Sequence, residues 1–195
     1  MLGVAAYLYM DNSHILIGLV GRKRAGKDTA AATLVREFDF TALAYADPVK
    51  EAAERLDPIV GVRYWPIARG IRLSDVVADR GWEEAKALPE VRRTLQRLGT
   101  EVVRTVEPDF WVEQLERRLL DASGPVVVTD CRFPNEVDLI RQYGGLIVRV
   151  VRPSAERADG HSSEQVDDLD FDIEIVNDGT LEDLAQQVRR VILTN

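Results

Sequence analysis

The stretch that decides the fold of this chain reads Gly21-Arg22-Lys23-Arg24-Ala25-Gly26-Lys27-Asp28-Thr29. An apolar run, residues 15–20, precedes it, and a helix-forming run, residues 30–36, follows it. A strand, a glycine-containing loop and a helix in this order form a cradle for phosphate groups. Gly21 and Gly26 let the backbone turn several N–H groups toward one anion, and the helix adds the positive end of its dipole. The sequence therefore predicts a phosphate-binding loop.

Two residues of this loop indicate the chemistry of the ligand. Lys27 can reach the β- and γ-phosphates of a nucleoside triphosphate as a mobile point charge. The usual motif has Ser or Thr after the lysine to hold Mg²⁺, whereas this chain has Asp28 followed by Thr29. A carboxylate is a hard oxygen ligand, so one interpretation of Asp28 is a magnesium ligand, directly or through water. The alternative is that Asp28 only caps the helix, because Asp is a favoured N-cap.

Length and composition limit the class of protein. With 195 residues, of which 46% are hydrophobic, we expect one globular domain over residues 1–195, with room for an insertion or a lid. The net charge of −8 argues against binding of a nucleic-acid polymer. The single cysteine, Cys131, cannot form an intrachain disulfide, which fits the reducing cytoplasm. No apolar run approaches the about 18–20 residues needed to cross a membrane, and the apolar residues 2–9 are open to interpretation as an extra strand or a dimer contact.

Apolar runs alternate with segments of helical period, which is typical of a parallel sheet covered by helices on both faces. We predict strands at residues 15–20, 41–46, 126–129, 146–151 and 173–176, with the first in the centre. We predict helices at residues 49–56, 67–87 with a break near Gly81, 89–104, 109–120, 135–143 and 181–193. Residues 59–66 are expected to be irregular. The polar stretch 152–171 is predicted to be a lid, since exclusion of water suits phosphoryl transfer.

Two charged residues follow the apolar strand 126–129. Ligands of open parallel sheets collect at the carboxyl ends of the strands, so we expect Asp130 to face the same crevice as the phosphate loop and to serve Mg²⁺ or an acceptor. The alternative is an ordinary turn residue. Arg132 is placed to bridge two phosphate groups and to offset charge in a transition state. The alternative for Arg132 is a surface ion pair with Glu136, which lies at a helical spacing.

Seven motifs, taken in order, resemble one family. The first half contains Gly-x₄-Gly-Lys-Asp-Thr, Tyr45-Ala46-Asp47-Pro48-Val49-Lys50, and Leu95-Gln96-Arg97-Leu98-Gly99-Thr100-Glu101 with Arg104. The second half contains Asp130-Cys131-Arg132-Phe133-Pro134-Asn135-Glu136, Arg149-Val150-Val151-Arg152-Pro153, His161-Ser162-Ser163-Glu164 and Asn177-Asp178-Gly179-Thr180-Leu181. This order is similar to that of the phage-type deoxynucleoside monophosphate kinases, members of the P-loop kinase superfamily that transfer the γ-phosphate of ATP to dNMPs. The similarity runs from about residue 15 to the C-terminus.

The resemblance implies a P-loop kinase fold with a central, mostly parallel five-stranded sheet, a helical acceptor-binding region at residues 47–121 and a lid at 152–171. It implies Lys27, Arg132 and Asp130 as catalytic residues, with Asp28 and Asp130 near Mg²⁺. The residues expected to bind ATP are Gly21, Arg22, Lys23, Arg24, Ala25, Gly26, Lys27, Asp28, Thr29, Arg152, Asn177 and Gly179. The residues expected to bind the acceptor are Lys50, Arg92, Gln96, Gly99, Thr100, Trp111, Asp130, Arg132 and Glu136.

Three of these residue assignments have structural alternatives. Trp111 is suited to stacking on a base, but core packing on an amphipathic helix explains it equally well. Asn177 and Gly179 would pass the adenine edge, or form an ordinary Asn-Asp-Gly turn. His161 would belong to the lid over ATP, or is simply solvated.

The implied ligands are ATP, Mg²⁺ and a dNMP, with no membrane and no nucleic-acid polymer as partner. Another small-molecule kinase is the nearest alternative, because phosphomevalonate kinases of the animal type also carry a Gly-Lys-Asp loop with basic residues. A nucleotide-switch ATPase without an acceptor is the alternative from a different class, although the chain lacks the Asn-Lys-x-Asp guanine motif. Base specificity, ribose preference and oligomeric state are open, and a homodimer is a common outcome for such chains.

Overall fold

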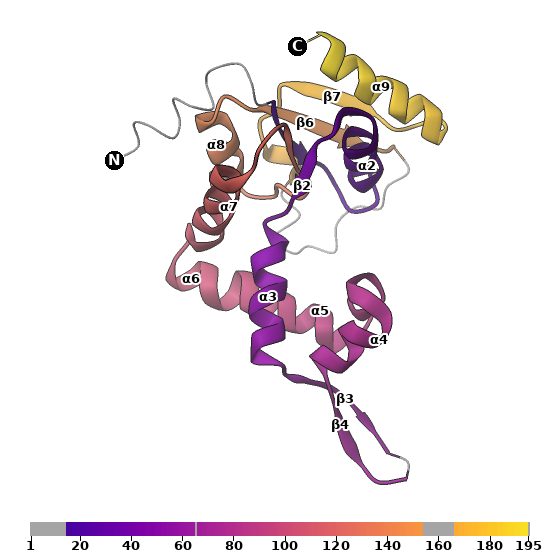
Figure 1. Ribbon diagram of the computed structural model, residues 1–195, viewed down its shortest axis with the longest axis vertical. Helices are drawn as coiled ribbons and strands as arrows, with labels where there is room; N and C mark the ends of the chain where they lie inside the picture. The colour runs from indigo at the N-terminus through magenta and orange to yellow at the C-terminus, as the bar shows by residue number, and fades with distance from the viewer. Residues whose placement is uncertain (1–14, 65, 154–165, 195) are drawn as a thin grey trace. The chain divides into compact units, whose positions relative to one another are not determined.

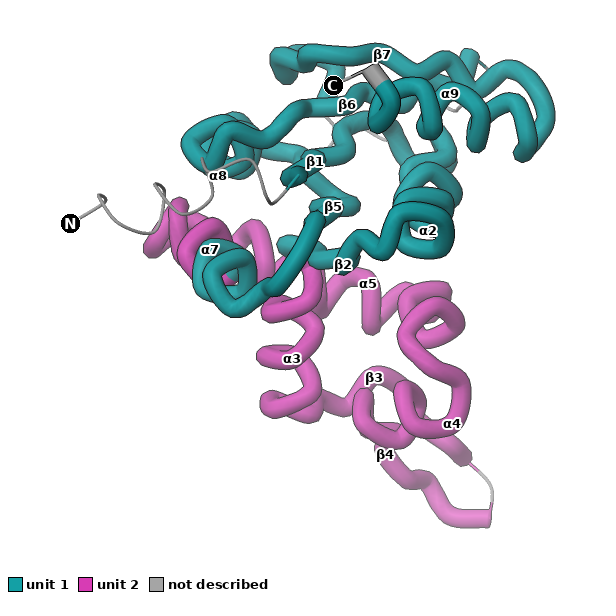
Figure 2. The backbone as a smooth tube through the Cα atoms, turned by 45° about the horizontal axis from the view of Figure 1, so that its top comes forward, with its two compact units in different colours: residues 1–45, 115–195 teal, residues 46–114 magenta. Residues whose placement is uncertain are grey.

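The computed structural model of this chain describes residues 15–64, 66–153 and 166–194 (Figure 1). The chain divides into two compact units, which Figure 2 shows in different colours. Unit 1 comprises residues 1–45 and 115–195, and unit 2 comprises residues 46–114. Unit 2 is therefore an insertion within the sequence of unit 1, and each unit is described by itself.

Unit 1 is built on a five-stranded sheet with the order β2-β5-β1-β6-β7. Its strands are β1 (Leu16–Val20), β2 (Thr41–Leu43), β5 (Val126–Val128), β6 (Leu146–Val151) and β7 (Ile173–Val176). Every neighbouring pair in this sheet is parallel. All five residues of β1 are buried, as expected for a central strand covered on both faces. The predicted α/β fold, with residues 15–20 at the centre of a parallel sheet, is confirmed.

Helices cover both faces of the sheet. On one face α2 (Lys27–Phe38) and α9 (Leu181–Thr194) pack together, and Leu34 and Leu184 join Ile17 of β1 in one core cluster (Figure 1). On the other face lies α8 (Pro134–Gln142), where Ile140 reaches the space above Gly18 of β1. The alternation of Ile17 and Gly18 between the two faces is what places a helical layer on each side of β1.

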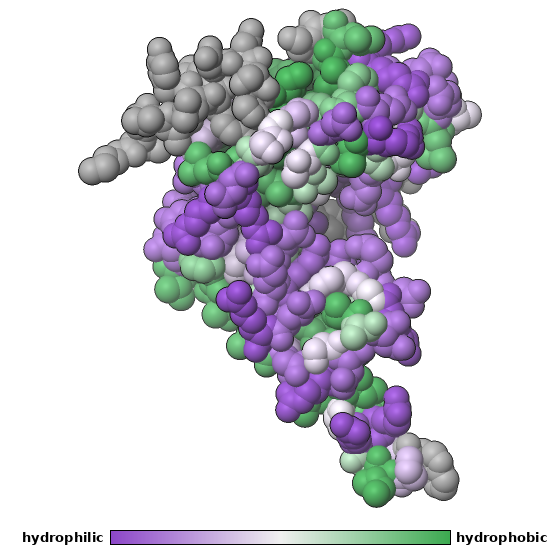
Figure 3. Space-filling model, viewed as in Figure 1, coloured by the Kyte–Doolittle hydropathy of each residue, from purple (hydrophilic) through white to green (hydrophobic). Residues whose placement is uncertain are grey.

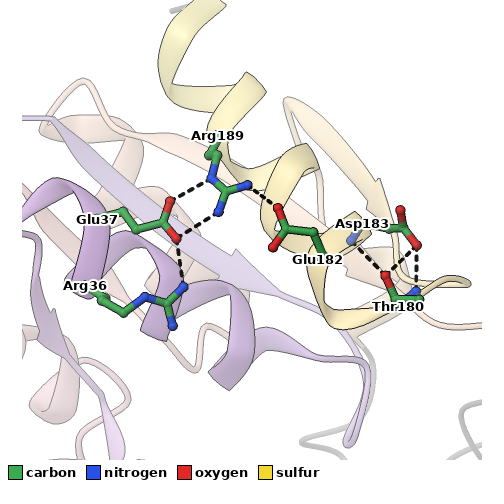
Figure 4. A network of polar contacts seen from close by, with 6 residues as sticks. All are labelled: Arg36, Glu37, Thr180, Glu182, Asp183 and Arg189. Carbon is green, nitrogen blue, oxygen red and sulfur yellow. Dashed lines mark hydrogen bonds and ion pairs between the residues drawn. The ribbon is translucent and has the colours of Figure 1, made fainter.

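A polar network on the surface joins α2 to α9 (Figure 4). Arg189 of α9 donates to Glu37 of α2 through Nε at 2.7 Å and Nη2 at 3.0 Å, and its Nη1 donates to Glu182 at 2.6 Å. Arg36 donates to the same Glu37 carboxylate at 2.8 Å. These bonds lower the pKa of Glu37 to about 2, chiefly because of Arg189. The network fixes the two helices that border the phosphate loop.

Unit 2 contains a hairpin and several helices. Its elements are α3 (Ala46–Leu56), β3 (Ile59–Arg63), β4 (Arg69–Arg72), α4 (Leu73–Ala85), α5 (Pro89–Gln96), the π-helix η1 (Arg97–Val103) and α6 (Arg104–Val106), and α7 (Phe110–Asp121) begins in it. A second core cluster, centred on Ala53, Leu73 and Val91, holds these helices together. The break predicted near Gly81 is confirmed, because this residue has non-helical angles inside α4.

Three expectations were wrong. Residues 69–72, predicted to lie in a helix, form strand β4, and α4 begins only at Leu73. Residues 59–66 are not irregular: β3 pairs with β4 in an antiparallel hairpin. Within β3 only Val60 is buried, while Ile59 and Val62 are exposed, so the strand lacks the alternation that marks a half-buried sheet. In Figure 3 the hairpin accordingly shows hydrophobic surface beside hydrophilic surface. The strand predicted at 41–46 ends at Leu43, because Ala46 already begins α3 and a proline fits the first turn of a helix.

Two predicted features lie outside the described residues. They are the role of residues 2–9 and most of the lid, including His161. Of the lid, residues 152–153 and 166–171 are described. Within the part of the chain that is described, no helix is long and apolar enough to cross a membrane.

Candidate active site

The phosphate loop connects the carboxyl end of β1 to the first turn of α2. Gly21 has a φ of 142° and Gly26, the N-cap of α2, has a φ of 110°. A Cβ on Gly21 would lie 2.3 Å from the carbonyl oxygen of Val150, and one on Gly26 would lie 2.4 Å from Nδ2 of Asn177. Both positions therefore require glycine for space as well as for backbone conformation. The N-cap is Gly26, so the interpretation of Asp28 as the N-cap was wrong, and Asp28 lies exposed in the first turn.

Asn177 ties this loop to the end of β7. Its side chain is 8% exposed, and Nδ2 donates to the carbonyl oxygen of Ala25 at 2.8 Å. Its backbone N–H donates to the carbonyl of Val151 at 2.7 Å, which fixes the residue on β6. The side-chain amide therefore stabilises the loop, and contact of Asn177 with an adenine edge stays a prediction.

Lys27 folds back over the loop. Its ammonium group donates to the carbonyl oxygens of Gly21 at 2.6 Å and Arg22 at 3.0 Å. Burial lowers the pKa of Lys27 and the nearby charge of Arg132 lowers it further, while Asp28 and Asp130 oppose this shift. The charges of Arg132, Asp28 and Asp130, the other predicted catalytic and metal-binding residues, therefore all act on the Lys27 ammonium group.

Asp130 stands at the carboxyl end of β5. Its Oδ1 accepts the backbone N–H of Tyr45 at 2.7 Å, and the hydroxyl of Tyr45 donates to the carbonyl of Glu136 at 2.8 Å. The residues before and after Asp130 bond to the neighbouring strands: the N–H of Thr129 donates to the carbonyl of Leu43 in β2, and the N–H of Cys131 donates to the carbonyl of Leu19 in β1. Asp130 is thereby held at the edge of the sheet where the phosphate loop also lies.

Glu136 has a structural task at the start of α8. Its side chain is 2% exposed, and Oε2 accepts the backbone N–H groups of Arg132 at 2.7 Å and Phe133 at 3.2 Å. A carboxylate in this position satisfies donors at a helix N-terminus. The partner of Glu136 in these bonds is the backbone of Arg132, whose side chain is exposed. Contact of Glu136 with an acceptor stays a prediction.

A pocket of about 440 Å³ opens beside the loop within unit 1, a volume typical of small-molecule sites. It is lined by Arg24, Gly26, Asp28, Thr29, Arg152, Asn177, Gly179, Thr180 and Leu181. Seven of these residues were predicted to bind ATP from the sequence, and the structure brings them together. Thr180 and Leu181 were missed. The available signal was the pattern Thr180-x-x-Asp183 before an apolar run, a helix start, and Thr180 does donate to Asp183 through its N–H at 2.8 Å and its hydroxyl at 2.7 Å.

The other predicted acceptor residues lie in unit 2. Lys50 forms an ion pair with Asp47 at 2.7 Å, Arg92 is exposed, and Gln96 and Thr100 are half-buried on the helix that runs from α5 into η1. Trp111 is only 3% exposed, and its Nε1–H donates to the carbonyl of Gly99 at 2.8 Å. This burial favours core packing for Trp111 over stacking on a base. The carbonyl that accepts this hydrogen bond belongs to the π-helix η1, and π-helices often occur at functional sites.

A phosphate loop between the central strand of a parallel sheet and a covering helix defines the class of P-loop nucleotide-binding α/β proteins. The sequence model of the family "Deoxynucleotide monophosphate kinase" matches residues 75–188. A protein of Acanthamoeba polyphaga mimivirus, named provisionally as a deoxynucleotide monophosphate kinase, is 30% identical over 89% of this chain and 94% of its own length. This chain belongs to the deoxynucleotide monophosphate kinase family, so the family predicted from the sequence is confirmed.

Two further proteins are similar to this chain. The deoxynucleotide monophosphate kinase of Escherichia phage RB69 is 32% identical over 52% of this chain, a match that covers 44% of the phage protein. Among solved structures, TT1252 from Thermus thermophilus has a TM-score of 0.52 at 20% identity, covering 94% of this chain and 98% of its own. The latter likeness shows the fold alone.

Proposed function

We propose that this protein transfers the γ-phosphoryl group of ATP to the 5′-phosphate of a deoxynucleoside monophosphate, giving ADP and a deoxynucleoside diphosphate. The observation that carries the proposal is the position of the Lys27 ammonium group over the phosphate loop, within electrostatic reach of Arg132 and Asp130. Membership of the family supports a nucleotide as acceptor. Phosphoryl transfer needs positioning and charge stabilisation more than covalent chemistry, and these residues supply both.

On the donor side, the loop N–H groups and Lys27 would bind the phosphates of ATP. In this structure the ammonium group of Lys27 donates hydrogen bonds to two loop carbonyls. A phosphate group would be a stronger acceptor for it, because a phosphate is charged. The pocket beside Arg24, Arg152 and Gly179 is the proposed place of the nucleoside. Arg132, whose side chain is exposed, would stabilise the negative charge of the transferred group.

Magnesium fits the carboxylates that are present. Among residues 15–64, 66–153 and 166–194 there is no group of three or more His, Cys, Asp or Glu side chains that could hold a metal ion. Mg²⁺ needs no such cage, because it is usually bound by one or two carboxylates together with substrate phosphates. Asp28 and Asp130 would be these carboxylates, and the ion would neutralise charge on the β- and γ-phosphates.

On the acceptor side, we assign binding of the dNMP to residues of unit 2. Lys50 and Arg92 supply cations suited to a 5′-phosphate, while Gln96 and Thr100 supply hydrogen-bonding groups. We place the reaction in the cytoplasm, where ATP and dNMPs occur and where an unpaired thiol is stable. We also propose that the protein forms a homodimer, which light scattering tests.

The experiment is ADP release from Mg·ATP with each of the four common dNMPs, dUMP, the matching ribonucleotides, phosphomevalonate and a blank without acceptor. Turnover that requires a deoxynucleotide supports the proposal, and the ranking of bases reveals what the acceptor pocket recognises. Turnover with phosphomevalonate alone would assign the protein to another kinase class. An equal rate in the blank would make it an ATPase and remove the acceptor site.

A further inference from the structure

Arg22, the second residue of the phosphate loop, is paired with a carboxylate that lies 145 positions away in the sequence. Its Nε donates to Oδ1 and Oδ2 of Asp167, both at 3.1 Å, and its Nη2 forms a further bond to Oδ2. The planar fork of a guanidinium group matches a carboxylate and a phosphate in the same bidentate way. Asp167 is therefore bound to a guanidinium group, that of Arg22, which is equally suited to bind a phosphate ligand.

The position of Asp167 is set by the fold of unit 1. Its neighbours Val166 and Leu169 are 3% and 7% exposed and anchor the short segment that carries it. Arg149 of β6 approaches Oδ1 of Asp167 at 3.7 Å, and its guanidinium lies over the ring of Phe171, 5.0 Å from the ring centre. The bond to Arg22 holds the pKa of Asp167 below its usual value, so this carboxylate is charged at neutral pH. Asp167 is thus a fixed anion between two guanidinium groups.

The contact between Arg22 and Asp167 is suited to exchange. The two side chains are 35% and 40% exposed, so water reaches the pair and its net stabilisation is small. When Arg22 leaves, Asp167 keeps Arg149 beside it and is not left as an unpaired charge. A polyphosphate carries more negative charge than one carboxylate and is the stronger partner for Arg22.

The other cations of the loop differ from Arg22. Lys27 is bound to loop carbonyls, and Lys23 and Arg24 are exposed and form no ion pair with the residues that the structure describes. Among the four cations of the loop, Arg22 is the one that forms an ion pair with a carboxylate in the described part of the chain. A nucleotide that recruits Arg22 must first displace Asp167.

We propose that Asp167 is an internal counter-anion of the phosphate loop, which Arg22 exchanges for a phosphate oxygen of the bound nucleotide. Asp167 is a positioning residue that acts through Arg22, and it weakens the binding of ATP and ADP alike, which favours product release. The inference rests on the proposed function, because it takes the phosphates of the nucleotide as the ligand of the loop.

The test compares Asp167→Asn with Asp168→Asn by isothermal titration of the whole protein with Mg·ADP and with inorganic triphosphate. Asp168 is the matched control, since it is the next residue, is exposed and forms no ion pair with the described part of the chain. Asp167→Asn should tighten binding about two- to fivefold, the range expected for an exposed ion pair, while Asp168→Asn should change it much less. Asp167→Ser removes the same carboxylate with a smaller side chain and should give the same tightening.

A double-mutant cycle asks whether Asp167 acts through Arg22. In an Arg22→Gln background, Asp167→Asn should leave the affinity unchanged. Equal or weaker binding by both Asp167 variants, equal tightening by Asp168→Asn, or persistence of the effect without Arg22 would overturn the inference. Failure of the wild-type protein to bind either ligand would instead overturn the proposed function, on which this inference rests.

Discussion

Replacement of Asn177 by alanine should weaken both the fold and the binding of ATP. Asn177 is buried, and its amide donates at 2.8 Å to the carbonyl of Ala25, which is itself buried. Loss of the donor to a buried carbonyl costs about 1–3 kcal/mol. For a chain of this size each kcal/mol lowers the melting temperature by about 2–4 °C, so a loss near 2 kcal/mol lowers it by about 4–8 °C.

The effect on ATP follows from the same bond. Without it, nucleotide binding must supply part of the free energy that orders the loop around Ala25. If about 1–1.4 kcal/mol is transferred in this way, the Kd for ATP rises about five- to tenfold. The assays are thermal unfolding, with and without Mg·ATP, and isothermal titration with Mg·ATP.

Gln187→Ala is the matched control for Asn177→Ala. The Gln187 amide on α9 donates to the carbonyl of Val176 at 2.9 Å and accepts the N–H of Val176 at 3.2 Å, next to Asn177 but without a bond to the loop. This variant should lose stability in a similar range and keep the wild-type Kd for ATP. The reasoning fails if Asn177→Ala binds ATP like the wild type, or if Gln187→Ala weakens ATP binding as much.

Three further predictions concern catalysis, pH and thiol reactivity. Lys27→Ala should lower kcat by about 10²–10³-fold with an unchanged circular dichroism spectrum; near-normal kcat would contradict the role assigned to its ammonium group. The pKa of Glu37 is lowered from 4.5 to about 2 by Arg189 and Arg36, so its stabilising contribution is present above pH 4.5 and is lost as the pH falls toward 2. Glu37→Gln should therefore show a shallower decline of the urea midpoint over that interval, and an unchanged slope would exclude this carboxylate as the cause. Burial raises the pKa of the Cys131 thiol well above its usual value, so a disulfide reagent at pH 8 should modify it only after unfolding in urea; rapid labelling of the native protein would refute the burial.

The central strands β1 and β5 of unit 1 were predictable because they are parallel and every residue in them is buried. Such strands read as continuous apolar runs, and β6 and β7 occupy the residues predicted for them. The hairpin of unit 2 was missed for the opposite reason. Most of its apolar residues face solvent, so the sequence contains no alternation that reveals a buried face.

Some parts of the candidate site were likewise predictable from the sequence, and others were not. The residues of the phosphate loop are contiguous, so one motif identifies them all. The tasks of Asn177 and Trp111 depend on backbone groups that are more distant in the sequence, such as the carbonyl of Ala25 at a separation of 152 positions. A sequence indicates the type of such a side chain but not which backbone group it meets, so the bonds of the Asn177 amide and the Trp111 indole to the protein could not be predicted, and their contacts with ligands stay predictions.

The pairing of β2 with β5 has a consequence for how this architecture can change. Thr41 and Leu43 lie in register with Val126 and Val128, so the chain leaves the sheet and returns to it at hydrogen-bonded neighbours. Because the entropy of closing a loop grows only with the logarithm of its length, doubling the intervening segment costs about 0.6 kcal/mol. Changes in the length of residues 46–114, which lie within this segment, therefore cost little closure entropy and leave the register of β2 and β5 unchanged. Under the proposed function, exchange of this one continuous segment would change the acceptor that the protein binds.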